Sequence, residues 1–217
     1  MPEESGGLSG RKAEAARNDR AILDAAREVF MQDPGAPISA VAHEAGVGVG
    51  ALYRRYASKE VLLQTLCADG LRQYVAIAAG ALAADVAPVA AFTQFIEGII
   101  DSDVHALTVR LAGTFTPTEE LHALAAHAGA LGEQVFGRAQ AAGALRADLR
   151  ATDLPMLFEQ VTAIRLGGPA RTAELRRRYL ALLLDGLRPA AAGAPLPGSP
   201  PSGPELARRW RPGGDGR

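Results

Sequence analysis

Residues 38–56 constrain the fold more than any other part of the sequence, because they contain two short helical patterns separated by a glycine. The first pattern has an inner apolar stripe formed by Ile38, Val41, Ala42 and Ala45. Gly46 follows where the chain must leave the helix in a left-handed conformation, which costs a residue with a Cβ atom about 1 kcal/mol or more. Val47 and Leu52 then supply the contacts that hold the second helix against the first. The pattern predicts a helix-turn-helix.

The rest of the sequence favours an all-α fold of about nine helices. Of the 217 residues, 48% are hydrophobic and 22% charged, so the chain can bury a core, and long alternating strand patterns are missing. We expect a helix-turn-helix domain over residues 17–66, with a second helix at about 48–56, and a helical domain over 67–188. Residues 1–16 and the Pro/Gly-rich residues 189–217 are expected to be disordered, because they offer few apolar side chains to bury.

Local capping signals predict where several helices begin and end. Asn18 is expected to cap the first helix, which must stop before Pro34, and Ser58 to cap a long helix that runs to about Ala84. Residues Thr116–Glu119 offer a capping box with proline at the first helical position of another long helix.

Charge and cysteine content exclude several classes of protein. The net charge is −1, so any nucleic-acid surface must come from local placement of basic side chains. The single cysteine, Cys67, excludes an intrachain disulfide and a thiolate metal cluster. The first five residues lack the basic and apolar parts of a signal peptide, and the nearly uncharged stretch 75–95 is interrupted by Asp85 and Pro88. We therefore expect a cytoplasmic protein that does not enter the membrane.

The sequence over about residues 17–66 resembles the TetR family of transcriptional regulators. Several motifs occur in order and at the family's spacing, which makes the resemblance more specific than an isolated helix-turn-helix match. They are Ile22-Leu23-Asp24-Ala25-Ala26 with Val29-Phe30, Val41-Ala42-His43-Glu44-Ala45-Gly46-Val47, Leu52-Tyr53-Arg54-Arg55-Tyr56 and Ser58-Lys59-Glu60. The segment Tyr179–Arg188 also looks like the last helix of some members.

The resemblance implies a DNA-binding surface on and around the second helix. Its expected residues are Ser39, Gly48, Val49, Ala51, Tyr53, Arg54, Arg55 and Lys59. Tyr53 and Lys59 match positions that hold phosphates, whereas Val49, Ala51, Arg54 and Arg55 match positions that face the major groove. The family commonly has polar residues or threonine where this chain has Gly48, Val49 and Ala51, so fewer hydrogen bonds to bases are available. Readout then rests on guanine contact by Arg54 or Arg55, thymine-methyl contact by Val49 or Ala51, and DNA shape.

The resemblance also implies a homodimer on a palindromic operator, acting as a repressor that a small apolar ligand releases. The candidate pocket residues are five apolar residues and one threonine: Phe92, Phe95, Ile99, Phe115, Phe158 and Thr162. Taken one at a time, each of them is more typical of core packing. Candidate dimer residues are Phe158, Val161, Tyr179, Leu180, Leu183 and Leu187, since the last helix is apolar on more faces than one core requires.

Two alternatives of other classes remain open. The helical domain could only dimerise or bind a protein, which a fully packed bundle without an internal cavity would favour. A helical enzyme would need a cluster of ionisable residues, and the sequence offers none. Glu119 and His122 form a single Glu-x-x-His pair where a di-metal bundle needs two, and His105 and His127 are isolated. We therefore expect no cofactor, no metal and no catalytic residues.

Overall fold

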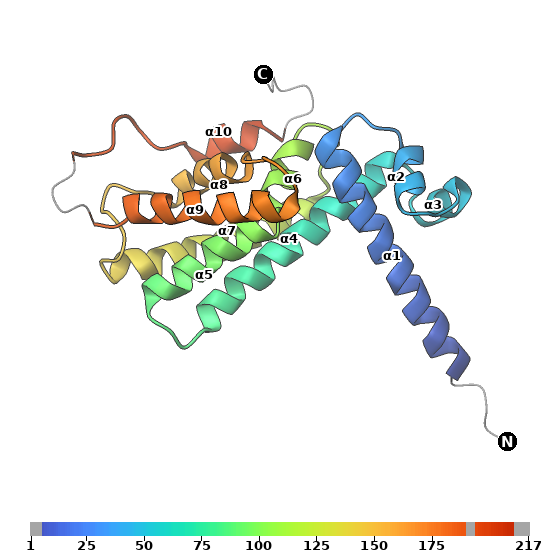
Figure 1. Cartoon of the computed structure of the whole chain (residues 1–217), viewed down its shortest axis with the longest axis horizontal. Coiled ribbons are helices and arrows are strands. Elements are labelled where there is room, and N and C mark those ends of the chain that lie inside the picture. The colour runs from blue at the N-terminus through green and yellow to red at the C-terminus, as the bar shows by residue number, and fades with distance from the viewer. Residues whose placement is uncertain (1–5, 190–193, 211–217) are drawn as a thin grey trace. The chain divides into compact units, whose positions relative to one another are not determined.

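The computed structural model describes residues 6–189 and 194–210, which form an all-helical protein (Figure 1). Within those ranges there are ten α-helices, one short 3₁₀-helix and no strands, where about nine helices were expected. Contacts divide the chain into two compact units, Met1–Leu66 and Cys67–Arg217. Each unit is built around its own buried side chains, and the two are described separately.

The first unit is a small helical domain. It contains α1 (Gly6–Gln32), α2 (Ile38–Glu44), α3 (Val49–Arg55) and the beginning of α4 (Lys59–Ala83). Its core consists of buried apolar side chains from all four helices, among them Ala26, Phe30, Val41, Leu52, Leu62 and Leu66. The apolar spacing read from the sequence therefore faces inwards, and α2 contacts both α1 and α3.

The first helix is longer than the sequence indicated. We expected disorder over residues 1–16 and a cap at Asn18, but α1 begins at Gly6, so the expectation is wrong for residues 6–16. Residues 1–5 lie outside the described part of the chain. Alanine, arginine, lysine and glutamate dominate residues 11–17, and these are strong helix formers. Once the packed residues from Ile22 onwards have formed helix, extension needs no apolar face.

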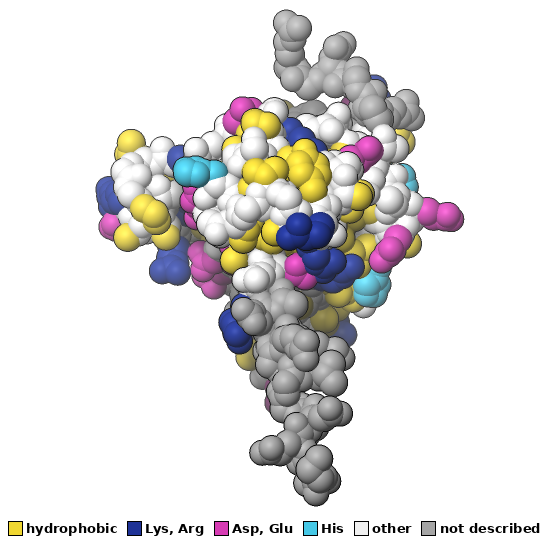
Figure 2. All heavy atoms as spheres, turned by 90° about the vertical axis from the view of Figure 1, so that its right-hand side faces the viewer, with side chains coloured by type: hydrophobic (Ala, Val, Ile, Leu, Met, Phe, Trp, Pro, Cys, Tyr) yellow, Lys and Arg dark blue, Asp and Glu magenta, His cyan; other side chains and the backbone are white. Residues whose placement is uncertain are grey.

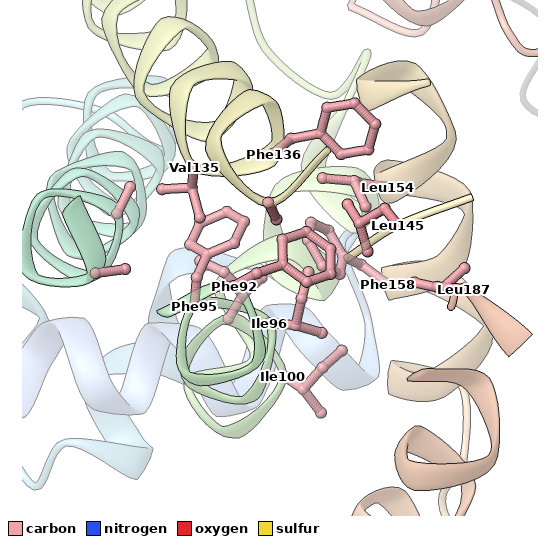
Figure 3. Close-up of a cluster of buried hydrophobic side chains, with 14 of the residues drawn as sticks. Phe92, Phe95, Ile96, Ile100, Val135, Phe136, Leu145, Leu154, Phe158 and Leu187 are labelled. Carbon is pink, nitrogen blue, oxygen red and sulfur yellow. The ribbon is translucent and has the colours of Figure 1, made fainter. Parts of the chain in front are cut away.

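The second unit is a bundle in which α5 occupies the centre. Its helices are the remainder of α4, α5 (Pro88–Asp101), α6 (Val104–Leu111), α7 (Glu119–Ala141), the 3₁₀-helix (Ala151–Asp153), α8 (Leu154–Thr162), α9 (Pro169–Gly186) and α10 (Gly203–Arg208). Helix α5 contacts α6, α7, α8 and α9. Its buried side chains Phe92, Phe95 and Ile96 meet apolar residues of α7 and α8 (Figure 3). Among the described residues no helix is long and apolar enough to cross a membrane.

Capping explains where two of the long helices begin. The hydroxyl of Ser58 accepts a hydrogen bond from the Val61 backbone N–H at 3.2 Å, and α4 begins at Lys59. Helix α7 differs from the expectation: Thr118, not Thr116, is the N-cap, accepting from the Leu121 N–H at 3.2 Å. The helix therefore begins at Glu119, two residues after Pro117.

The C-terminal tail packs on the bundle over its described part, which corrects the expected disorder of residues 189–217. Residues 190–193 and 211–217 lie outside the described chain. Ser202 and Glu205 form a reciprocal capping box that begins α10, with a proline in the first turn. Earlier in the tail, the Leu196 N–H donates to Asp148 Oδ2 at 2.8 Å. The capping box and these tertiary contacts order a segment that its composition alone would leave disordered.

Candidate nucleic-acid interface

The turn between α2 and α3 is made by Gly46, whose φ of 66° lies in the left-handed region. The Val47 N–H donates to the Ala42 carbonyl at 2.9 Å, and the Gly46 N–H donates to the His43 carbonyl at 3.1 Å. These two bonds define a Schellman motif, which satisfies carbonyls that the end of α2 would otherwise leave without partners. The turn directs the chain into α3, which begins three residues later at Val49.

Helix α3 has one buried side and one exposed side. Leu52 is fully buried, and Tyr56 directly after the helix is also buried. The candidate DNA-binding residues carried by α2 and α3, with the α3 N-cap, are all exposed: Ser39, Gly48, Val49, Ala51, Tyr53, Arg54 and Arg55. Val49 and Tyr53 keep 42% and 48% of their surfaces exposed. A helix with this exposed side can enter a major groove.

Arg55 is held by a carboxylate that the sequence analysis did not identify. Its Nε and Nη2 atoms donate to the two carboxylate oxygens of Asp19 at 2.6 and 2.5 Å. This bidentate pair raises the pKa of Arg55, first through the hydrogen bond and then through the charge of Asp19. Because the two residues are 36 positions apart, no local pattern signals the pair. A base contact by Arg55 would compete with the pair that Arg55 forms with Asp19. Arg54 is therefore the better candidate for a base contact.

Lys59 has a structural role within the first unit. Its Nζ atom donates to the Pro34 carbonyl at 3.0 Å and lies 5.2 Å from the centre of the Phe30 ring. The ammonium group therefore links the start of α4 to the loop before α2. A phosphate contact by Lys59 stays a prediction, and Tyr53 remains the exposed candidate for the same task.

Side chains of both charges lie on the face of the protein shown in Figure 2. Arginine and lysine side chains lie there together with acidic and hydrophobic ones. This agrees with a net charge of −1. A protein of this kind cannot rely on a broad positive field, and its DNA affinity must come from a few well-placed contacts.

The six candidate pocket residues are core residues in this structure. All are buried, and Phe92, Phe95, Ile99 and Phe158 belong to one hydrophobic cluster (Figure 3). Phe95 and Phe158 pack edge to face with their ring centres 6.3 Å apart. The Thr162 hydroxyl donates to the Phe158 carbonyl at 2.8 Å, and Phe115 packs against Trp210 of the tail. The side chains expected to line a pocket thus fill the space themselves, because their combined apolar surface is best buried by mutual contact.

One cavity in the described part has a candidate pocket residue on its border. A groove of about 260 Å³ lies between α5 and α9, bordered by Phe92 and also by Glu97, Arg177 and Asp185. A narrow gap beside Phe158 offers no room for a water molecule. A ligand pocket formed by the six residues stays a prediction, since in this conformation their side chains are buried.

The candidate dimer residues fall into two groups. Phe158, Val161, Leu180 and Leu187 are buried inside the subunit, so they cannot meet a partner directly, which corrects that part of the expectation. Tyr179 and the neighbouring Leu182 are 49% and 61% exposed, and Leu183 is partly buried against the core. Helix α9 therefore buries one stripe and leaves an apolar stripe on its surface.

The structure contains no group of three or more metal-ligating side chains among the described residues. Cys67 is buried, and burial raises the pKa of its thiol to about 12, which leaves it protonated and unreactive at neutral pH.

The exposed helix-turn-helix is the feature that defines the class of the protein. The class is that of helix-turn-helix DNA-binding regulators with a separate helical domain.

Comparison with known proteins agrees with this class. Residues 22–66 match the family model described as bacterial regulatory proteins of the tetR family, and residues 87–189 match that of the C-terminal domain of SbtR-like transcriptional regulators. A comparison with curated proteins finds no match. The chain belongs to the TetR family of transcriptional regulators, whose members regulate transcription and are not enzymes.

Three similar solved structures extend the comparison over most of the chain. A TetR regulatory protein from Mycobacterium vanbaalenii is 27% identical, with a TM-score of 0.56 over 82% of this chain and 98% of its own. A TetR regulator from Streptomyces coelicolor is also 27% identical, with a TM-score of 0.54 over 79% and 99%. The ketosteroid regulator KstR2 of Mycobacterium tuberculosis, at 18% identity, has a TM-score of 0.60 over 80% and 96% and shares the fold.

Proposed function

We propose that this protein is a homodimeric repressor that binds a palindromic operator through two copies of α3. The observation that carries the proposal is the exposed side of α3, which follows a glycine turn and presents Val49, Tyr53 and Arg54. Two-fold symmetry requires two half-sites about 34–36 Å apart, one in each of two successive major grooves. In this account Tyr53 contacts phosphate and Arg54 contacts a base edge.

Release by a small molecule is the second part of the proposal. A ligand can release DNA only if it binds the released conformation better than the DNA-bound one. Because Phe92, Phe95, Ile99 and Phe158 pack together in one cluster, a ligand that entered between them would have to separate Phe95 from Phe158. The proposed effector therefore acts on a conformation different from this one, or binds elsewhere on the bundle.

A domain that only dimerises, with no small-molecule effector, is the alternative. The packing of Phe92, Phe95, Ile99 and Phe158 into one cluster favours it. A DNA-release screen with small molecules separates the two: release by any compound at a saturable concentration excludes the alternative.

The neighbouring arginines of α3 test the DNA-binding proposal, once an operator has been selected. Arg54→Ala should weaken operator binding by about 10- to 100-fold and relax base preference at one position of each half-site, because a guanine contact is lost. Asp19→Asn should leave Arg55 less tightly held, and any base contact by Arg55 would then strengthen. Binding is measured by fluorescence anisotropy on the operator and on its single-base variants. Unchanged affinity and base preference in Arg54→Ala would remove Arg54 from the interface.

A further inference from the structure

The end of the C-terminal tail is attached to the bundle by one charged side chain and one aromatic side chain. The Arg209 guanidinium pairs with Glu159 of α8, and its Nη2 atom lies 3.8 Å from the Met156 sulfur. The next residue, Trp210, packs edge to face on Phe115 with ring centres 6.3 Å apart. A guanidinium and an aromatic ring thus bind side by side at one place on the second unit.

The carboxylate beneath Arg209 has an unusual neighbour. His105 of α6 is mostly buried, and its Nε2 atom lies 3.7 Å from Glu159 Oε1 without a hydrogen bond. The ring also hydrogen-bonds to the Pro155 backbone, whose carbonyl can only accept, so the ring donates this bond. Burial lowers the pKa of His105, whereas the charge of Glu159 acts to raise it. Glu159 also accepts a hydrogen bond from the Arg209 guanidinium, so the tail supplies a donor to this carboxylate.

The middle of the tail is held loosely compared with its two ends. Near its start the Ala194 carbonyl accepts from Arg146 at 3.1 Å, and the Leu196 N–H donates to Asp148. Between the ends, a cavity of about 490 Å³ separates residues 196–200 from Met156, Leu157 and other residues of the bundle. Breaking the contacts of Arg209 and Trp210 would therefore release the tail end without disturbing the hydrophobic cluster of α5, α7 and α8.

From this geometry we propose that Glu159, His105, Met156 and Phe115 form a binding site for an organic cation that carries an aromatic ring, and that Arg209 and Trp210 occupy it as an internal substitute. A carboxylate, a thioether and aromatic rings together recognise a flat cation such as an amidinium. An external ligand displaces the tail end. The second unit then has two states, one in which the tail end fills the site and one in which the ligand fills it. This site identifies the effector class for the proposed regulator, but ligand binding itself does not depend on DNA binding.

The tail gives the experiment its own signal, because Trp210 is the single tryptophan of the chain. The probe is benzamidine, an aromatic amidinium, added to the full-length protein, with the neutral analogue benzamide as control. We expect benzamidine to cause a saturable red shift of tryptophan emission as Trp210 leaves Phe115 and enters water. Benzamide should cause none.

Three variants test the assignment of residues, with circular dichroism used to check that each is folded. Glu159→Gln removes the charge and should weaken benzamidine binding by about tenfold or more. Arg209→Gln removes the internal competitor, so emission should be red-shifted before any ligand is added, and calorimetry should show benzamidine binding about tenfold tighter. The neighbouring Arg208→Gln is the matched control and should behave as the wild type.

Two results would overturn the proposal. If benzamidine bound neither the wild type nor Arg209→Gln at millimolar concentration, the site would not exist. If it bound Arg209→Gln but left Trp210 emission of the wild type unshifted, the tail would not be displaced. Neither readout involves DNA, so failure here is distinguishable from failure of the proposed DNA-binding function.

Discussion

His105 shows how one buried side chain can make stability depend on pH. Burial lowers its pKa from the ordinary 6.5, and the charge of Arg209 acts in the same direction, whereas Glu159 and the Pro155 carbonyl act to raise it. The net shift is downwards, so the unfolded chain binds the proton more tightly than the folded protein. Stability is therefore lost as the pH falls below about 6.5 towards the lowered pKa.

A comparison at two pH values tests this residue. We expect the free energy of unfolding to fall between about pH 7.5 and 5.5, and the fall to be smaller in His105→Gln, because that variant has no proton to gain at this position. Denaturant unfolding at both pH values provides the measurement. His122→Gln changes an exposed histidine and serves as the control. We expect its free energy of unfolding to fall by the same amount as that of the wild type. An equal fall in His105→Gln and wild type would show that His105 does not titrate as described.

At the residue scale, the sequence predicts which side chains are available but not what they contact. The exposed side of α3 follows from helical spacing and from the family motifs, so Val49, Tyr53 and Arg54 could be predicted. The partners of Arg55 and Lys59 could not. Asp19 is distant in sequence from Arg55, and Pro34 from Lys59. The two pairs form only when the helices of the first unit pack together.

At the scale of the helices, a glycine fixes how closely two of them cross. A Cβ atom at Gly98 of α5 would lie 2.8 Å from Cγ2 of Ile77 in α4, which is closer than side-chain carbons approach one another. The β-branched Ile77 is stiff and cannot move aside without changing its rotamer. The close crossing of α4 and α5 therefore depends on the missing side chain.

Two glycine-to-alanine variants test this crossing. Gly98→Ala should lower the free energy of unfolding by about 1–3 kcal/mol, because the added methyl group forces the helices apart. Gly80→Ala has nothing within 4 Å of the new atom and should raise it by about 0.5–1 kcal/mol through helix propensity alone. Thermal or denaturant unfolding of both variants gives the answer. A stabilised Gly98→Ala would mean that the crossing is wider than described.

Helix positions are predictable from sequence where a cap and an apolar stripe coincide, as they do at Ser58 and α4. The early start of α1 could not be predicted, since residues 6–16 show no apolar period in the sequence. Helix α10 could have been found, because Ser202 and Glu205 have the spacing of a capping box. Because prolines and glycines surround these two residues, the composition of the tail favoured disorder instead.

At the scale of the whole molecule, the exposed stripe of α9 predicts assembly. Leu182 is 61% exposed, so Leu182→Glu should leave the subunit folded while burying two like charges in a two-fold contact. Sedimentation should show a dimeric wild type at micromolar concentration and a monomeric variant. Operator affinity should fall steeply, because each half-site would be bound separately.

The control for this prediction is Leu166→Glu, which changes a leucine that is 65% exposed outside α9 and should remain dimeric. A monomeric wild type would contradict the proposed mechanism as a whole. The sequence indicated an excess of apolar surface on this helix, but it could not separate Leu182 from the buried Leu180. That distinction depends on how α9 is rotated against the core.

Selection of bound DNA from a random pool tests whether this protein reads a palindromic operator as a dimer. We expect enrichment of a two-fold symmetric sequence whose half-sites are centred about one helical turn, or a multiple of it, apart. We also expect Arg54→Ala to enrich the same symmetry with one position of each half-site relaxed. A pool that shows no enriched sequence, or an asymmetric site bound by a single subunit, would contradict this expectation.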